Sequence, residues 1–386
     1  MSVAILTPEG FKELRVLKEK GRRLVGYFCV YVPVEIIYAS GALPVRLARA
    51  DEDSARCGEG WLRADACPFC KASVGRFTSD PLYQMLDGLV MVNTCDMMRR
   101  LAEVLAERIA IPLFQLYLPR TAEQRANRIV EWTEQLRCLY RWAQGLTGVK
   151  VDDGGATEQL PLLNAIADYN RVRGLLQQLD RLRAMVPARL KASEIFDLVA
   201  QCTRYPPEMV GAWLKQEYAR RTGGLRSAEG AEATAPEPAG LVSDSRPRLM
   251  LAGSILVEED RLLLELIEEQ ADVVADAVCT GMRWFTEMVA DGEPLTEIAR
   301  FYFNRTPCAF RRPNTVLYDY LRRLIQERQV KGVVYKTLFY CDPWRFEIKR
   351  MRQELGLPVL EIDGDYCQEN RAQLRTRVEA FLEMLR

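Results

Sequence analysis

The segment DGLVMVNTCDMMRRLAEVLAERIAIPLFQL, residues 87–116, has the pattern of a strand, a helix and a second strand. Its first part, DGLVMVNTC, is an apolar run typical of a strand that is buried on both faces. MMRRLAEVLAERI has the spacing of an amphipathic helix, and IPLFQL predicts the next strand. Two strands joined by a helix indicate a parallel sheet, because the helix carries the chain back to the edge where the first strand began.

A second segment of the same design lies near the end of the sequence. KGVVYKTLFYC, residues 331–341, predicts a buried strand and is followed by the helix pattern PWRFEIKRMRQEL and the strand pattern LPVLEID. In both segments the cysteine that ends the first strand lies 17 residues before the proline of the next strand, at Cys95 and Pro112 and at Cys341 and Pro358. We therefore expect the two halves of the chain to contain related α/β units.

The cysteine of each unit is expected next to a helix start. Asp96 and Asp342 stand where a helix N-cap is expected, and Pro343 stands where the first helical residue is expected. Ligands of open α/β sheets bind at the carboxyl ends of the strands, and a helix N-terminus there favours the thiolate form of a cysteine. Two such crevices that face each other would bring Cys95 and Cys341 together.

Other apolar runs complete two α/β regions. Strand patterns occur at 23–28 (RLVGYF), 43–47 (LPVRL), 247–254 (PRLMLAGS) and 271–279 (ADVVADAVC), and PVEIIYASG (33–41) has a helical pattern. Strands that alternate with helices predict the α/β class, here two doubly wound parallel-sheet domains of flavodoxin or Rossmann type.

The chain is expected to have four parts. Residues 1–120 are predicted to form an N-terminal α/β domain and residues 248–386 a C-terminal α/β domain. Residues 121–221 contain amphipathic runs such as ANRIVEWTEQLRCLYRWAQGL, whose aromatic residues have helical spacing, and they predict an inserted helical subdomain with these aromatics in its core. Residues 222–247 are rich in Gly, Ala, Pro, Ser and Glu and predict a linker or surface loop.

The composition of the 386 residues excludes several classes of function. Because there is no histidine, a Ser-His-Asp enzyme and a His-ligated zinc hydrolase are excluded. Lys and Arg together number 53, as do Asp and Glu, so no net charge favours nucleic acid or an anionic membrane. No signal-peptide pattern or membrane span is present, so we expect a cytoplasmic protein. No G-x-x-x-x-G-K-S/T motif occurs, so no nucleotide site is expected and ATP chemistry must come from another protein.

The chain has eleven cysteines, which in a reducing compartment are either small buried side chains or metal ligands. Six lie at predicted strand ends or in loops beside proline, which is more than packing alone would place there. These six are Cys29, Cys67, Cys95, Cys279, Cys308 and Cys341. Of the others, Cys138 and Cys202 fall in helical runs, and Cys57 and Cys367 lie in turn-rich segments and have no assigned role.

The motif CPFC joins Cys67 to Cys70 and has several interpretations. A glutaredoxin-like redox site should follow a strand directly, but the preceding residues CGEGWLRADA are loop-like. A zinc ribbon needs a second close pair of ligands, and no other C-x-x-C occurs. In a purely structural interpretation, Cys67 starts a helix and Cys70 is simply buried.

With these cysteines placed, the chain resembles the iron–sulfur components of the 2-hydroxyacyl-CoA dehydratase and benzoyl-CoA reductase family. The resemblance covers roughly residues 20–118 and 247–386, through GYFCVYVPVEIIYASGALPVRL, ACPFCKASVG, VNTCD, the PC-x5-N segment at Cys308 to Asn314, FYCDPW and LRTRVEAFLEML. It implies two α/β domains with a [4Fe–4S] cluster in the cleft between them, held by Cys67, Cys95 and Cys341.

The resemblance also implies partners and a reaction. The partners are a homologous subunit, in a homo- or heterodimer, and a separate ATP-hydrolysing iron–sulfur activator that supplies a low-potential electron. The cluster then drives the removal of water from a 2-hydroxyacyl-CoA or the reduction of a recalcitrant bond. Glu35, in the family-like PVEII segment, is the candidate for proton transfer.

A branch of the family, the double-cubane cluster proteins, binds two linked cubanes, an [8Fe–9S] cluster, through six cysteines. Cys29, Cys279 and Cys308 match that pattern, whereas CTGMRW and FYCDP also resemble subunits with one cubane per chain. Both cluster types stay open, as does any contact of Cys70 with iron. Three further hypotheses are a double-cubane reductase of small molecules, a non-catalytic electron-transfer protein and a CxxC thiol oxidoreductase.

Overall fold

The computed structural model describes residues 11–123, 126–149, 156–223, 246–305, 308–366 and 371–386. Most of the predicted linker at 222–247 lies outside the described residues, and so does Cys367.

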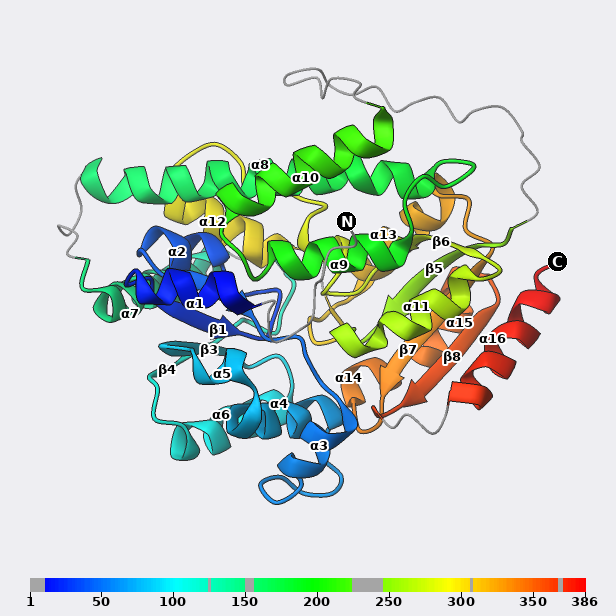
Figure 1. Cartoon of the computed structure of the whole chain (residues 1–386), viewed down its shortest axis with the longest axis horizontal. Helices are drawn as coiled ribbons and strands as arrows, with labels where there is room; N and C mark the ends of the chain where they lie inside the picture. Colours follow the sequence, from blue (N-terminus) through cyan, green and yellow to red (C-terminus); the bar gives the residue numbers. More distant parts are fainter. Residues whose placement is uncertain (1–10, 124–125, 150–155, 224–245, 306–307, 367–370) are drawn as a thin grey trace.

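Two parallel sheets of four strands each organise the chain (Figure 1). The N-terminal sheet has the order β2-β1-β3-β4, and the C-terminal sheet has the order β6-β5-β7-β8. The N-terminal strands are β1 (Leu24–Tyr27), β2 (Leu43–Arg46), β3 (Gly88–Val92) and β4 (Leu113–Leu116). The C-terminal strands are β5 (Arg248–Gly253), β6 (Asp272–Asp276), β7 (Gly332–Leu338) and β8 (Val359–Gly364). The predicted α/β class with two doubly wound parallel sheets is confirmed.

The central strands are apolar because helices cover both of their faces. Every residue of β1, β3 and β7 is buried. Within each sheet the first strand pairs with the second on one side and with the third on the other, so both sheets have the same order of connection.

Helices surround each sheet. The N-terminal domain has α1 (Lys12–Glu19), α2 (Val34–Ala39), α3 (Glu52–Gly58), α4 (Pro68–Ser79), α5 (Pro81–Gln84) and α6 (Asp96–Arg108). The C-terminal domain has η2 (Glu258–Asp260), α11 (Arg261–Glu268), η3 (Met282–Trp284), α12 (Pro294–Asn304), α13 (Thr315–Glu327), α14 (Asp342–Arg345), α15 (Ile348–Leu355) and α16 (Arg371–Met384).

Four helices lie between the two sheets in the sequence, and as a group they contact both domains. They are α7 (Ala126–Thr147), α8 (Ala156–Ala184), α9 (Ala192–Cys202) and α10 (Pro207–Thr222). The long helix α8 contacts α2 of the N-terminal domain and β6 of the C-terminal domain, and it runs along the top of both in Figure 1. Trp132 and Tyr140 of α7 are buried, as their spacing predicts.

The helix caps differ from the prediction. Cys95 is the N-cap of α6, where its Sγ accepts the Met98 N–H at 3.4 Å, so Asp96 is already the first helical residue. The thiol sulfur takes the position that an aspartate oxygen was expected to take. Cys341 likewise precedes α14, so Pro343 is the second helical residue rather than the first. The single helix expected after Cys341 is two helices, α14 and α15.

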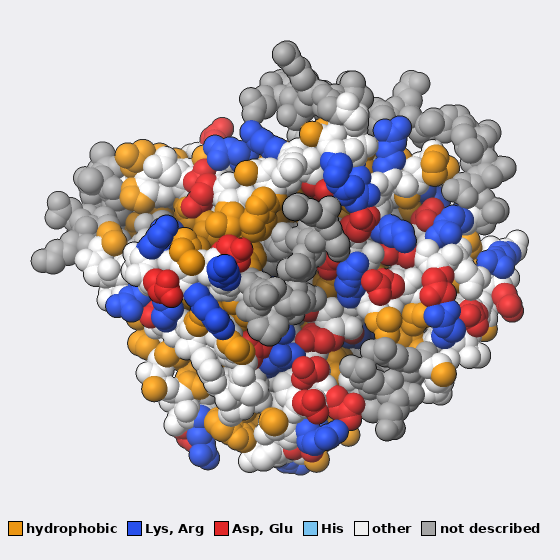
Figure 2. All heavy atoms as spheres, viewed as in Figure 1, with side chains coloured by type: hydrophobic (Ala, Val, Ile, Leu, Met, Phe, Trp, Pro, Cys, Tyr) orange, Lys and Arg blue, Asp and Glu red, His pale blue; other side chains and the backbone are white. Residues whose placement is uncertain are grey.

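Charged side chains are mixed over the face seen in Figure 2, with Lys and Arg beside Asp and Glu. This agrees with the equal numbers of acidic and basic residues in the chain. Within the described ranges, no helix has the length and apolar character needed to cross a membrane.

Candidate functional site

A cavity of about 130 Å³ lies where the two sheets meet, and seven cysteines line it. They are Cys29, Cys67, Cys70, Cys95, Cys279, Cys308 and Cys341. These are the seven residues that the sequence offered as cluster ligands, and the structure brings all of them together. Apolar and aromatic side chains, among them Phe28, Phe69 and Trp344, form much of the remaining wall.

The strand order explains why these residues meet. In each sheet the second strand is added on one side of the first strand and the third strand on the other side. The order of strands therefore reverses between β1 and β3 in one domain and between β5 and β7 in the other. Loops leaving neighbouring strands at such a point diverge and leave a crevice at the carboxyl ends. The cavity is lined by residues that follow β1, β3, β5, β6 and β7, so the crevices of both sheets open into one space.

Cys67, Cys95 and Cys341 form a first group of thiols. Each is an N-cap residue, of α4, α6 and α14 respectively. Burial raises the pKa of Cys341 well above its ordinary value, and the charges of Cys67 and Cys95 raise it further. The three sulfurs are therefore close enough to repel one another as thiolates.

Cys29, Cys279 and Cys308 form a second group. Burial raises the pKa of Cys29 to about 12, and the charges of Cys308 and Cys279 add to the shift. The two groups adjoin, because the charge of Cys308 also contributes to the raised pKa of Cys95, which burial brings to about 12. The cavity thus holds two neighbouring groups of three thiols.

Buried arginines surround the second group. Arg46 donates one N–H to the Cys279 Sγ at 3.2 Å and another to the Cys279 carbonyl at 2.6 Å. Arg283 lines the cavity within electrostatic reach of all three thiols, and Arg311 interacts with Cys308. These cations lie where a strongly negative cofactor would need compensating charge. Sequence reasoning missed them; the available signal was an arginine, Arg46, at the end of an otherwise apolar strand.

Cys70 differs from the other six cysteines. Its side chain is buried, lies 4.0 Å from Met98 Sδ and forms a hydrogen bond with Cys67. That hydrogen bond lowers the pKa of Cys67 and raises the pKa of Cys70 well above its ordinary value. Cys70 is therefore the protonated partner of Cys67.

The donor set fits an iron–sulfur cluster better than a single ion. In the described part of the chain no carboxylate lines the cavity, and soft thiolates are the ligands of iron–sulfur clusters. Among the described residues, no three thiols or carboxylates are arranged to share one metal ion. In a cluster each thiolate binds a different iron, so the sulfurs stand farther apart. Burial raises the pKa of several of these cysteines, and a bound metal cation would nevertheless keep them in the thiolate form.

Glu35 does not line this cavity. It is completely buried in α2, where it forms an ion pair with Arg173 of α8 and accepts a hydrogen bond from the Tyr302 hydroxyl at 2.8 Å. Both carboxylate oxygens are occupied by these partners. The structure therefore places Glu35 in a polar network that joins α2, α8 and α12.

Comparison with known proteins gives a consistent result. Residues 29–385 match the family model described as 2-hydroxyglutaryl-CoA dehydratase, D-component. YjiM of Escherichia coli (strain K12), named as a candidate dehydratase subunit, is 30% identical over 97% of this chain and 95% of its own length. The (R)-phenyllactyl-CoA dehydratase beta subunit of Clostridium sporogenes is 21% identical over 96% of this chain and 94% of its own. A benzoyl-CoA reductase subunit of Thauera aromatica is 22% identical over 92% of this chain and 84% of its own.

Proposed function

This chain belongs to the 2-hydroxyglutaryl-CoA dehydratase D-component family, and we propose that it is the iron–sulfur catalytic component of a dehydratase or reductase of that kind. The observation that carries the proposal is the meeting of six thiols from two domains in one apolar cavity. The curated relatives named above are subunits of dehydratases and of benzoyl-CoA reductase, which supports an enzymatic role.

The grouping of the thiols favours two linked cubanes over one. Cys67, Cys95 and Cys341 would hold the first cubane, and Cys29, Cys279 and Cys308 the second. The two groups adjoin, because the charge of Cys308 contributes to the raised pKa of Cys95, and two linked cubanes would need neighbouring sets of thiol ligands. A single cubane would leave three partly buried thiols and the arginines beside them without a role.

The protein side chains have separable roles around this site. When bound, the cluster supplies low-potential electron transfer. Arg46 and Arg283 balance negative charge beside the second group. The aromatic wall excludes water, which strengthens electrostatic interactions inside the cavity.

A separate protein is proposed as the electron donor. The sequence has no Walker A motif, so ATP hydrolysis would take place on an activator with its own iron–sulfur cluster. Several relatives are named as beta subunits of dehydratases, which supports a homologous second subunit as a further partner.

An acyl-CoA thioester is the first candidate substrate, because the names of several relatives contain acyl-CoA substrates. Reduction of a small molecule is the second candidate, and the scarcity of cationic side chains in the cavity wall favours it over the polyanionic coenzyme A. The space is about 130 Å³, and Arg283 is its one cationic side chain within the described part of the chain. Acyl-CoA thioesters and small oxidised molecules, each offered with reduced activator, distinguish the two by product formation.

The cluster is tested by iron and sulfide analysis of anaerobically purified protein. Two linked cubanes predict about eight irons per chain, one cubane predicts about four, and the absence of iron rejects the proposal. Cys95→Ala and Cys341→Ala should abolish normal loading. Cys279→Ala should lower the iron content only if there are two cubanes, and Cys138→Ala, an exposed thiol of α7, is the matched control.

The same variants test the thiol oxidoreductase alternative. Cys67 and Cys70 are both buried, whereas thiol exchange needs an accessible sulfur. If only Cys67 and Cys70 matter for activity and the iron content is zero, thiol exchange is the function. Full loading without any substrate turnover supports a carrier of electrons instead.

A further inference from the structure

The wall of the thiol-lined cavity contains no Asp, Glu or Lys among the described residues, so its thiol and hydroxyl groups have no acidic side chain in that wall to resupply them with protons. Removal of a hydroxyl group as water consumes a proton, and so does reduction of an unsaturated bond. On the proposed function, reduction of an unsaturated bond consumes one proton for each electron, and dehydration needs a proton at the leaving hydroxyl, so a group near the cavity must deliver protons.

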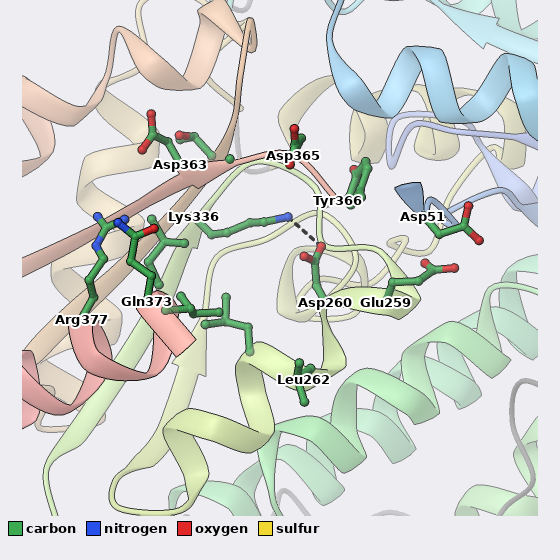
Figure 3. A pocket seen from close by; sticks show the side chains of 15 residues that line it. Asp51, Glu259, Asp260, Leu262, Lys336, Asp363, Asp365, Tyr366, Gln373 and Arg377 are labelled. Carbon is green, nitrogen blue, oxygen red and sulfur yellow. Dashed lines mark hydrogen bonds and ion pairs between the residues drawn. The ribbon is translucent and has the colours of Figure 1, made fainter. Parts of the chain in front are cut away.

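A second pocket, of about 180 Å³, meets the thiol-lined cavity at the end of β7, because Thr337 lines the pocket and the next residue, Leu338, lines the cavity. Lys336 and Thr337 of β7 line it, together with Glu259 and Asp260 of η2 and Tyr366 beyond β8. Asp51 reaches it from the N-terminal domain, so the pocket lies between the domains (Figure 3). Lys336 is within electrostatic reach of Cys67, which joins the pocket to the cavity.

Tyr366 lines the second pocket and is close enough to Cys67 and Cys70 for their charges to raise its pKa. Its side chain is more than nine-tenths buried, and its hydroxyl has no hydrogen-bond partner among the described residues although it lines the pocket. Burial raises the pKa of Tyr366, and the charges of Asp260, Cys67, Glu259 and Cys70 raise it further. The charges of acidic groups and the charges of thiols therefore both act on the Tyr366 hydroxyl.

Glu259 is one of the acidic groups of the pocket that have access to solvent. Its side chain keeps 30% of its surface exposed, yet its oxygens are fixed by Arg76 at 2.7 Å and by the Ala50 N–H at 3.0 Å. Burial raises its pKa to about 7, so it can both hold and release a proton near neutral pH. The charged and titratable groups that face it come from η2, α3, α4, β7 and the end of β8; they are Glu258, Asp260, Asp51, Arg76, Lys336 and Tyr366.

We propose that this pocket is the proton inlet of the thiol-lined cavity, with Glu259 as the collecting carboxyl and the Tyr366 hydroxyl as the connecting group. The Tyr366 O–H bond breaks as its proton passes toward the group that is reduced in the cavity, and at the same time the Tyr366 oxygen takes up a proton that Glu259 gives through water from solvent. The Glu259 carboxylate then regains a proton from solvent. No electron moves in these steps, and each completed cycle delivers one proton.

The test uses anaerobic, iron-loaded protein and Tyr366→Phe and Glu259→Gln variants. Removal of an unpaired buried hydroxyl is expected to leave folding intact, and the glutamine keeps an acceptor for the Ala50 N–H. The protein is reduced with titanium(III) citrate in a stopped-flow instrument, and proton uptake is followed with a pH indicator. Tyr27→Phe is the matched control, because its buried hydroxyl also has no partner among the described residues and Tyr27 does not line either pocket.

Wild-type protein and Tyr27→Phe should take up protons at a rate that falls as the pH rises through about 7. Tyr366→Phe should slow proton uptake about 100-fold at unchanged iron content, and Glu259→Gln should also remove the pH dependence. Proton uptake by Tyr366→Phe at the wild-type rate, or no uptake by wild-type protein on reduction, overturns the inlet. Iron-free wild-type protein would instead reject the proposed function, so the two failures are distinguishable.

Discussion

At the scale of single residues, the structure shows an ion pair between Glu35 and Arg173 that is shielded from solvent. Both side chains are fully buried, and the Tyr302 hydroxyl completes the set. A buried charge that loses its partner is costly, although the intact pair adds little compared with an apolar replacement. Glu35 is thus expected to matter for folding rather than for proton transfer.

Glu35→Ala is predicted to lower the free energy of unfolding by about 3–5 kcal/mol, because it leaves the Arg173 guanidinium buried and unpaired. The joint change Glu35→Leu with Arg173→Met should recover part of this loss. Urea unfolding monitors both, and Glu103→Ala, at an exposed ion pair with Arg100, is the control with an expected effect within about 1 kcal/mol. A Glu35→Ala protein of normal stability but without turnover would restore Glu35 as a catalytic candidate.

Glu259 makes a prediction about pH and stability. The pKa of Glu259 is about 7 in the folded chain, whereas that of a glutamate in the unfolded chain is 4.5. Between pH 4.5 and about pH 7 the folded state therefore keeps a proton that the unfolded state has released. Stability therefore falls with rising pH over that window, where the folded state binds more protons. Compared with Glu259→Gln, wild-type protein should lose free energy of unfolding from about pH 4.5 to about pH 7. Above that range the difference in free energy of unfolding between the two proteins should stay constant. Chemical unfolding of both proteins across pH 4–8 checks this, and a constant difference contradicts it.

At the residue scale, sequence patterns locate cysteines better than they locate charges. The thiols could be found because they follow strands or stand beside proline, and both positions are visible in the sequence. The burial of Arg46 and Arg283 could not be found in this way, because a single arginine is expected to be exposed until the fold shows that it is buried. Glu35 was chosen from a family-like segment, and its partner Arg173 lies 138 residues away.

At the scale of elements, strand patterns were reliable and helix ends were not. Buried parallel strands are continuous apolar runs, so all eight could be located, although the predicted run to Cys95 extends past the end of β3 at Val92. Helix starts depend on one side chain accepting one backbone N–H. A cysteine in that position was not anticipated, because Asp96 and Asp342 are the commoner caps.

The helices α3 and α4 approach each other so closely that glycine is required. A Cβ on Gly75 would lie 2.0 Å from the Ser54 carbonyl oxygen, and one on Gly58 would lie 2.0 Å from that of Lys71. Both obstacles are backbone atoms, so neither can rotate away. The contact positions the start of α4, where Cys67 and Cys70 lie.

Gly75→Ala is predicted to lower the free energy of unfolding by about 3 kcal/mol and to reduce iron content as α4 is pushed outward. Gly145→Ala in α7 is the control, because nothing lies within 4 Å of its added Cβ. That change should leave iron loading intact and stabilise the protein by up to about 1 kcal/mol. Thermal unfolding and iron analysis test both, and normal loading in Gly75→Ala would show that α4 tolerates displacement.

At the scale of the whole molecule, the two domains are joined by ion pairs and by the cavity itself. Arg76 of α4 pairs with Glu259, and Arg49 pairs with Glu258, so both pairs cross between the domains. The repeated strand order made the facing crevices predictable, since each half has the same pattern. How the helices α7 to α10 pack over both halves was not predictable, because their apolar faces do not specify a partner.

Cluster binding is predicted to stabilise both domains together. A ligand held by residues of both domains stabilises only the closed arrangement. Loaded protein should unfold roughly 5 °C or more above iron-free protein. Hydrogen exchange should slow in the loops after β1 and β3 and, to the same extent, in those after β5, β6 and β7. Protection confined to one domain would contradict a shared cluster.

The distribution of thiols over the two halves affects how the protein is made. The first group takes Cys67 and Cys95 from the N-terminal half and Cys341 from the C-terminal half, and the second takes Cys29 from the first half and Cys279 and Cys308 from the other. A nascent chain whose first domain has already folded on the ribosome can therefore complete neither group. On the proposed function, metal delivery would therefore belong to the finished polypeptide, and a truncated product should leave the cell's iron supply untouched.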